Sequence, residues 1–188
     1  MQYYEMMVDG GKRRENDIIA RPCVEVKDKN VLYEGVFIND WDNDMTFEYD
    51  PKEGYIVPEY LCNVYGWSIF SGKSIKLFGD LISSDVQLLP IKIVNKNTGQ
   101  ETDKYFVINV LPFLDALDLK NSIYDYLGTG GKKRLSVIKY GIKKEKVGKH
   151  HIFRLKESQF ALFVSEEFYK VVKKNKMAGC DFLKVKTS

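Results

Sequence analysis

The sequence has few cysteines, few prolines and no long hydrophobic run. Its 188 residues include 3 cysteines, Cys23, Cys62 and Cys180, which are far apart and match no metal-ligand spacing. An odd number of scattered cysteines is typical of a reduced, intracellular protein. No apolar stretch approaches the roughly 20 residues of a membrane-spanning helix, and the N-terminus lacks a basic-then-apolar signal pattern. We therefore expect a cytoplasmic protein without a membrane span, although secretion without a cleaved signal stays open.

Apolar and aromatic residues are plentiful. Hydrophobic residues make up 44% of the chain and aromatic residues 13%, which is ample for a sizeable core and argues against disorder. With only 5 prolines and no Ser/Gly-rich linker, the chain reads as one domain or as two half-domains that share a core.

The charges are divided unevenly along the chain. Residues 1–119 contain 12 basic and 20 acidic residues, whereas residues 120–188 contain 17 basic and 6 acidic residues. Such asymmetry can mark an interaction surface, or it can reflect two solvated faces.

Hydrophobic patterning predicts an α+β fold that is strand-rich, with a mixed or antiparallel sheet and few helices. The best helix spans residues 166–177, where acidic residues open the first turn and lysines occupy the last. The predicted strands cover residues 3–8, as an edge strand, and residues 31–38, 86–94, 105–111, 135–142, 150–155 and 180–185.

Two segments have the same spacing between a serine and the next strand, which suggests a repeated strand–helix–strand unit. An apolar strand ends in Ser71 in one segment and in Ser165 in the other, and each serine suits a helix N-cap. The following strands begin 15 positions later in both, at Val86 and Cys180. Because most residues differ between the two segments, this prediction rests on their equal spacing alone.

Several short motifs resemble known binding sites but lack the residues that binding requires. Residues 71–74 resemble the end of a phosphate-binding loop, but the first glycine is misplaced and bulky strand residues fill the loop. Residues 40–44 resemble half of a calcium loop, but Met45 and Pro51 stand where glycine and glutamate are needed. His150 and His151 should point to opposite faces of a strand and so cannot share a metal. We therefore expect no catalytic site, no metal and no cofactor.

An acidic loop that contains a tryptophan is a better candidate for a binding surface, since aromatic residues are enriched at protein interfaces. The alternative surface is basic and follows a glycine-rich loop. The acidic candidate comprises Asp40, Trp41, Asp42, Asp44 and Phe47, and the basic one comprises Lys132, Lys133 and Arg134.

Residues of about 55–186 together resemble the eleventh-numbered immunity-protein family of bacterial polymorphic toxin systems. The features that carry the resemblance are an aromatic strand ending in Asn, an Asp-x-x-Asp-x-x-x-Ser run, an Ile-Phe-Arg-Leu strand, a Val-Ser-Glu helix start and a Gly-x-x-Phe end. The matching residues are Asn109, Asp115, Asp118, Ser122, Ile152–Leu155, Ser165, Gly179 and Phe182, with Ser84–Pro90 upstream. Residues 1–54 match more loosely and read as a variable N-terminal region of the same globule, whereas residues 55–188 form the family domain.

The resemblance implies a cytoplasmic antitoxin without enzymatic activity, whose partner is a cognate toxin protein. The acidic loop would then meet a basic toxin, and the basic surface would suit an acidic one. Asp118 and Ser122 are expected to hydrogen-bond the backbone in a turn. The alternative is a nucleic-acid- or nucleotide-binding module that uses the basic C-terminal half, although no nucleic-acid signature is present and the acidic half would repel phosphates.

Overall fold

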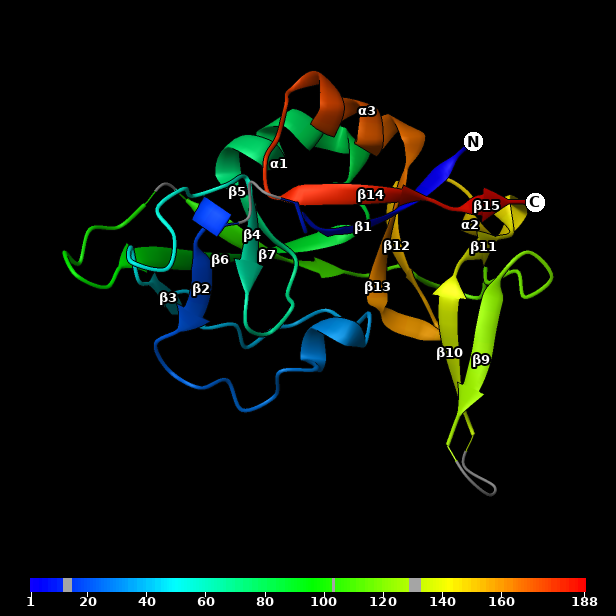
Figure 1. Ribbon diagram of the computed structural model, residues 1–188, viewed down its shortest axis with the longest axis horizontal. Helices are drawn as coiled ribbons and strands as arrows, with labels where there is room; N and C mark the ends of the chain where they lie inside the picture. Colours follow the sequence, from blue (N-terminus) through cyan, green and yellow to red (C-terminus); the bar gives the residue numbers. More distant parts are fainter. Residues whose placement is uncertain (12–14, 103, 129–132) are drawn as a thin grey trace.

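A computed structural model of the protein describes residues 1–11, 15–102, 104–128 and 133–188. A six-stranded barrel lies beside a five-stranded sheet, which confirms the prediction of a strand-rich α+β fold (Figure 1). None of the described helices combines the length and apolarity needed to cross a bilayer. The elements are β1 (Tyr3–Val8), β2 (Ile19–Pro22), η2 (Val31–Tyr33), β3 (Thr46–Tyr49), β4 (Tyr60–Asn63), β5 (Ile69–Ser71), α1 (Gly72–Phe78), η3 (Gly79–Leu81), β6 (Val86–Asn95), β7 (Tyr105–Val110), β8 (Phe113–Leu114), β9 (Ile123–Leu127), β10 (Arg134–Lys139), β11 (Gly141–Ile142), α2 (Lys144–Val147), β12 (Ile152–Leu155), β13 (Ser158–Ser165), α3 (Glu166–Lys174), β14 (Cys180–Lys184) and β15 (Lys186–Thr187).

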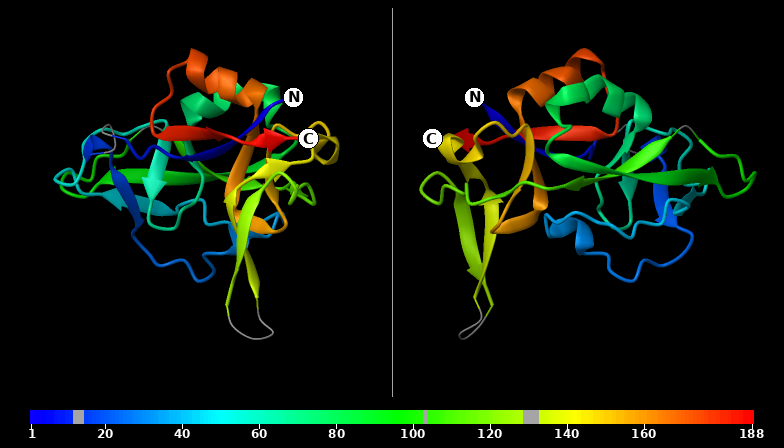
Figure 2. Two further views of the ribbon diagram at one scale, coloured as in Figure 1. Left: turned by 45° about the vertical axis from the view of Figure 1, so that its right-hand side comes forward. Right: turned by 180° about the vertical axis from the view of Figure 1, so that it is seen from behind.

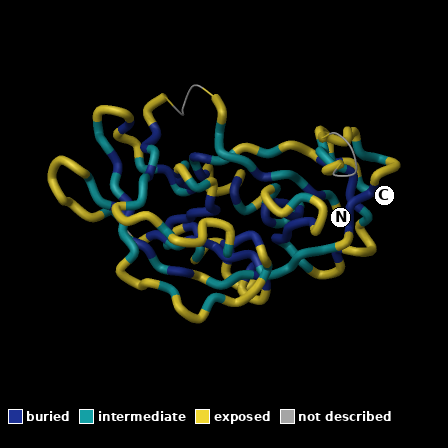
Figure 3. Tube along the Cα trace, turned by 90° about the horizontal axis from the view of Figure 1, so that it is seen from below, coloured by how far each residue is buried: buried dark blue, intermediate teal, exposed yellow. Residues whose placement is uncertain are grey.

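The barrel closes in the strand order β2-β3-β6-β7-β5-β4 and has its own aromatic core. Trp67 fills its interior, and the indole N–H donates to the carbonyl oxygen of Lys29 at 3.0 Å. Because side chains alternate along a strand, β5 and β7 also contribute side chains to a second core. Ile69 and Val107 point into the barrel, whereas Phe70 and Ile108 pack against the five-stranded sheet and the helices. Figure 3 shows buried segments in the interior and exposed ones on the connecting loops.

The five-stranded sheet has the order β14-β1-β13-β12-β8, and cores lie on both of its faces. Helices α1 and α3 lie side by side over one face (Figures 1 and 2). Phe78 of α1 stacks on Phe168 of α3 with ring centroids 4.1 Å apart. The other face is covered by α2, β11 and one side of β10, which contribute Val147, Ile142, Leu135 and Val137 to one apolar cluster.

The predicted repeat exists as two strand–helix–strand units with the same topology. Ser71 accepts a hydrogen bond from the backbone N–H of Ser74, and Ser165 accepts one from that of Phe168, so each serine caps its helix. In both units one antiparallel strand separates the two flanking strands: β7 lies between β5 and β6, and β1 lies between β13 and β14. The units therefore share their connectivity as well as their spacing.

Three strand predictions need correction. Residues 3–8 form β1 inside the sheet, between β13 and β14, rather than at its edge. Residues 31–38 do not form a strand, because side-chain amides form hydrogen bonds with backbone groups that would otherwise pair with a neighbouring strand. Gln87 exchanges two hydrogen bonds with the backbone of Ile38, and Asn109 donates to the carbonyl oxygen of Val36 at 2.7 Å. The predicted strand 135–142 is divided into β10 and β11.

A buried arginine joins the barrel to the sheet. Arg154 of β12 is only 2% exposed, and its guanidinium donates to the carbonyl oxygens of Gln159 and Phe160, at 3.1 and 2.8 Å. It also reaches Ser68 at 3.3 Å and lies 4.9 Å from the centroid of the Tyr33 ring. Burial lowers the pKa of Arg154, and none of the ion pairs between described residues includes it. Neutral oxygens and an aromatic face therefore hold this cation.

We expect Arg154→Ala to lower the free energy of unfolding by about 3 kcal/mol or more, since a hydrogen bond to a charged group contributes about 1.5–3 kcal/mol and a cavity adds to the loss. Arg154→Met retains the bulk and removes the cost of burying a charge, so its loss should be smaller. Urea unfolding of both variants measures the difference. An unchanged midpoint for Arg154→Ala would contradict this role for the guanidinium.

Candidate functional site

The acidic loop between η2 and β3 is on the surface and locally ordered. Asp40 and Asp42 are exposed, and a carboxylate oxygen of Asp42 accepts the backbone N–H of Asp44 at 2.9 Å. Asp44 is exposed but ion-paired, since its carboxylate lies 2.8 Å from the ammonium of Lys92. The hydrogen bond from Lys92 holds the pKa of Asp44 below its usual range. Two of the three carboxylates therefore have no ion-pair partner among the described residues.

Trp41 anchors this loop to the barrel. Its indole N–H donates to the carbonyl oxygen of Pro90 at 2.9 Å, and its ring lies 6.0 Å from that of Trp67. The indole N–H is therefore already satisfied within the protein, whereas the half-buried ring keeps some exposed surface. The other predicted contact residue, Phe47, has no exposed surface and packs against Tyr65 and Trp67 inside the barrel. Its inclusion in the interface was wrong, because alternation in β3 points this side chain inward.

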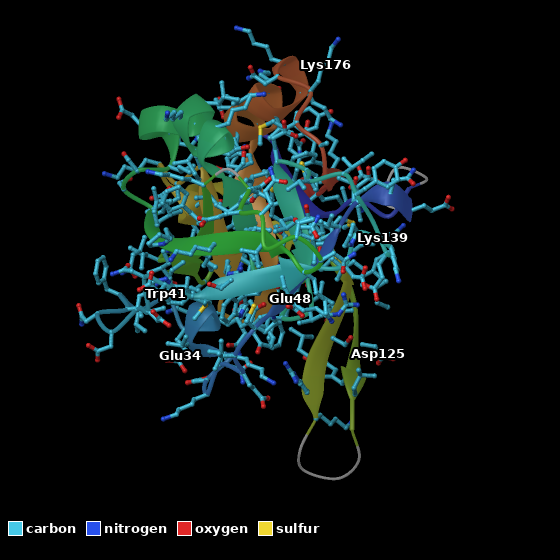
Figure 4. All side chains as sticks on the ribbon, turned by 90° about the vertical axis from the view of Figure 1, so that its left-hand side faces the viewer. Glu34, Trp41, Glu48, Asp125, Lys139 and Lys176 are labelled. Atoms are coloured by element: carbon cyan, nitrogen blue, oxygen red, sulfur yellow. The ribbon has the colours of Figure 1, made fainter. Side chains whose placement is uncertain are left out.

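The basic candidate lies on another part of the molecule. Lys133 and Arg134 are exposed at the start of β10, and Lys132 is outside the described residues. Figure 4 shows Trp41 and Asp125, which belong to the acidic loop and to β9, well separated across the molecule. The two candidate surfaces are therefore not brought together.

The residues of the family pattern occupy structural positions. Asp118 accepts the backbone N–H of Lys120 and the side-chain amide of Asn121, at 3.1 and 2.7 Å. Ser122 donates to the carbonyl oxygen of Asp118 at 2.7 Å and accepts the N–H of Gly141 at 2.9 Å. These bonds fasten the start of the hairpin to β11. Asp115, in contrast, is exposed.

Gly179 and Phe182 hold β14 in place. Gly179 has φ +90, and a β-carbon there would lie 1.9 Å from the carbonyl oxygen of Tyr60, so only glycine fits. The ring of Phe182 meets those of Tyr4 and Tyr169 edge to face. Neither residue is positioned for chemistry.

The two histidines have separate partners. His150 lies 2.7 Å from a carboxylate oxygen of Asp85, whose other oxygen accepts the backbone N–H of His151. The ring of His151 lies 2.8 Å from the hydroxyl of the helix cap Ser165. Both histidines precede β12 rather than lying within the predicted strand 150–155. This network links Asp85, which directly precedes β6, to the helix cap. Residues 1–11, 15–102, 104–128 and 133–188 contain no group of acids, histidines or cysteines fit to hold a metal.

Sequence reasoning missed Asp85, Arg154 and the apolar surface of the hairpin. A single arginine within the apolar run Ile152–Leu155 was a signal for a buried cation. Nothing in the sequence indicated that Ile123 and Ile138 would be exposed, because their exposure depends on how the hairpin leaves the body of the protein.

A family described as the immunity protein family (Imm11) has a sequence model that matches residues 9–187. A comparison with curated proteins finds no match.

We expect Asp118→Ala to lower the free energy of unfolding by about 1–3 kcal/mol, because donors in the turn lose their acceptor. Hydrogen bonds from Asn121 and Ser188 hold the pKa of Asp118 below its ordinary value of 3.8. The carboxylate therefore contributes stability above that value, and the contribution is lost as the pH falls through the lowered pKa. Urea unfolding from neutral pH to about pH 2 should show the wild type and the variant converging in acid.

Asp118→Asn keeps an acceptor oxygen and serves as the control, with an intermediate loss at neutral pH. If Asp118→Ala kept full stability yet lost its biological function, the residue would belong to an interface instead of a turn.

Proposed function

The chain belongs to the Imm11 immunity protein family, and we therefore propose that it binds and neutralises a cognate toxin domain by protein–protein interaction. The family match over residues 9–187 carries this proposal. A cytoplasmic location in the cell that also encodes the toxin is part of it. The protein would act by covering or immobilising the toxin's functional surface.

The surface chemistry supports protein recognition over catalysis. Among the residues of the family pattern, Ser165 caps α3, and Asp118 and Ser122 fasten a turn. Large apolar side chains remain exposed on the loop before β3, at the start of β13 and on the hairpin, among them Phe37, Phe160 and Leu127. On the hairpin the exposure is contiguous, since the rings of the exposed Tyr124 and Tyr126 lie 5.9 Å apart, and contiguous apolar exposure marks interaction sites.

The acidic loop is one proposed part of the interface. Its backbone is held by the Asp42 turn and by the Trp41 anchor, so little ordering would be needed on binding. Exposed carboxylates on such a loop would accelerate encounter with a basic partner. Asp40, Trp41, Asp42 and Asp44 form this proposed contact region, without Phe47.

The proposal is tested by co-purification with the toxin domain encoded by the adjacent gene, together with rescue of growth when both are expressed. One-to-one recovery with rescue is expected. Failure of both, combined with salt-dependent binding to random DNA, would favour the alternative of a nucleic-acid-binding module.

We expect replacement of Asp40, Asp42 and Asp44 together by Ala to slow association with the toxin by about tenfold at low salt, because steering by charge acts on the association rate. The dissociation rate should change less, and the effect should shrink as ionic strength rises. Stopped-flow or surface-based kinetics would measure both rates.

Replacement of the exposed acids Asp80, Glu145 and Glu157 by Ala is the matched control, since it removes the same charge elsewhere. An association rate that fell equally in both variants would point to net charge rather than to this loop.

A further inference from the structure

The β9–β10 hairpin projects from the body of the protein as a two-stranded sheet (Figures 1 and 2). All five residues of β9 are exposed, including Tyr124, Tyr126 and Leu127. Only the side of the hairpin that carries Leu135 and Val137 packs partly against the body. An isolated two-stranded hairpin is marginally stable in water and gains stability from a further strand or a packed surface. Its free surfaces therefore favour a partner.

A groove of about 310 Å³ runs between the base of this hairpin and the β14–β15 segment. Ile123, Ile138 and Leu183 line it and are 52%, 65% and 56% exposed. The register of β9 and β10 shifts between Val137 and Lys139, so Ile138 sits in a bulge. Bulges re-aim side chains, which accounts for an isoleucine that faces the groove rather than the core. Three aliphatic side chains thus meet at one exposed place.

The rim of the groove is basic. Lys139, Lys184 and Lys186 line it, and none of them is ion-paired within the part of the chain that the structure describes. The one carboxylate is that of Glu5, which is half-buried on β1 beside Leu183. Burial raises the pKa of Glu5, so its negative charge is disfavoured there. The groove therefore combines an apolar centre with an excess of positive charge.

The strand that forms one wall of the groove is an edge strand. In the described part of the chain β14 pairs with β1 alone, and β14 ends the order of the five-stranded sheet. The backbone N–H of Phe182 is bound by the carboxylate of the neighbouring Asp181 at 2.8 Å instead of by a strand. This edge N–H is therefore already satisfied, and the groove lies farther along the strand, at Leu183 and Lys184.

We propose that this groove, formed by the hairpin base and the β14–β15 segment, docks a segment of the cognate toxin that carries aliphatic side chains flanked by carboxylates. The inference rests on the proposed function and specifies its interface. Aliphatic side chains of the toxin pack on Ile123, Ile138 and Leu183, and its carboxylates meet the three lysines. Docking there also adds packing to the exposed side of the hairpin.

The test uses the full chain and the toxin domain encoded by the adjacent gene. The variant Ile123→Thr/Ile138→Thr/Leu183→Thr removes the apolar centre while keeping strand propensity and exposed positions. We expect its dissociation constant for the toxin to rise at least tenfold, since well-packed residues at the centre of an interface contribute most of its affinity. Lys139→Glu/Lys184→Glu/Lys186→Glu should weaken binding further and reverse its salt dependence.

The matched control is Ile56→Thr/Val64→Thr/Leu77→Thr, which alters three exposed aliphatic residues outside both the groove and the acidic loop and should leave the affinity unchanged. Thermal unfolding of each variant checks that the fold is retained. In the complex, amide hydrogen exchange should slow in β9, β10 and β14.

A tight wild-type complex that the groove variant forms equally well would overturn this inference and leave the proposed function intact. The absence of both complex and growth rescue for the wild type would overturn the proposed function, and the groove assignment with it. A wild-type dimer that the groove variant converts to a monomer would assign the groove to a second copy of this chain and would also overturn the inference.

Discussion

The barrel and the sheet depend on one buried cation that has no carboxylate partner among the described residues. Arg154 can stay charged there only because carbonyl oxygens at the start of β13, the hydroxyl of Ser68 and the ring of Tyr33 surround it. Each of these groups belongs to a different part of the chain, so satisfying one guanidinium fixes their relative positions. The turn between β12 and β13 must be tight enough to present the oxygens of Gln159 and Phe160, and η2 must close over the barrel.

The two strand–helix–strand units explain how this arrangement is reached from a short repeated pattern. In each unit a serine ends a strand and caps a helix, which sets the angle at which the helix returns over the sheet. Stacking of Phe78 on Phe168 then joins the units through their helices. His151 adds a polar link between the same units, because its backbone N–H donates to Asp85 and its ring contacts the hydroxyl of Ser165. The histidines thus have a structural explanation that requires no catalytic role.

Local signals in the sequence were sufficient for much of the fold, and non-local ones were not. The Ser71 and Ser165 caps, the strand at 105–110 and the fold class follow from patterns within a few residues. The failures depend on distant partners: residues 31–38 are held by Gln87 and Asn109, and Phe47 is buried because the barrel closes around it. For the binding surfaces, composition identified the acidic loop but not the groove, since Ile123, Ile138 and Leu183 meet only in the folded chain.

The acidic loop and the groove beside the hairpin lie apart in space, as the positions of Trp41 and Lys139 show (Figure 4). The acidic loop is polar at its tip and anchored by Trp41, so it suits long-range attraction more than apolar contact. The groove beside the hairpin has exposed aliphatic side chains at its centre, which is the composition that slows dissociation. A toxin that presents a basic region and an acidic, apolar segment at the matching separation would engage both. The acidic loop would repel the acidic segment of the toxin, and the basic groove would repel its basic region. The two surfaces together would therefore fix the orientation of the complex and reject toxins with a different charge pattern.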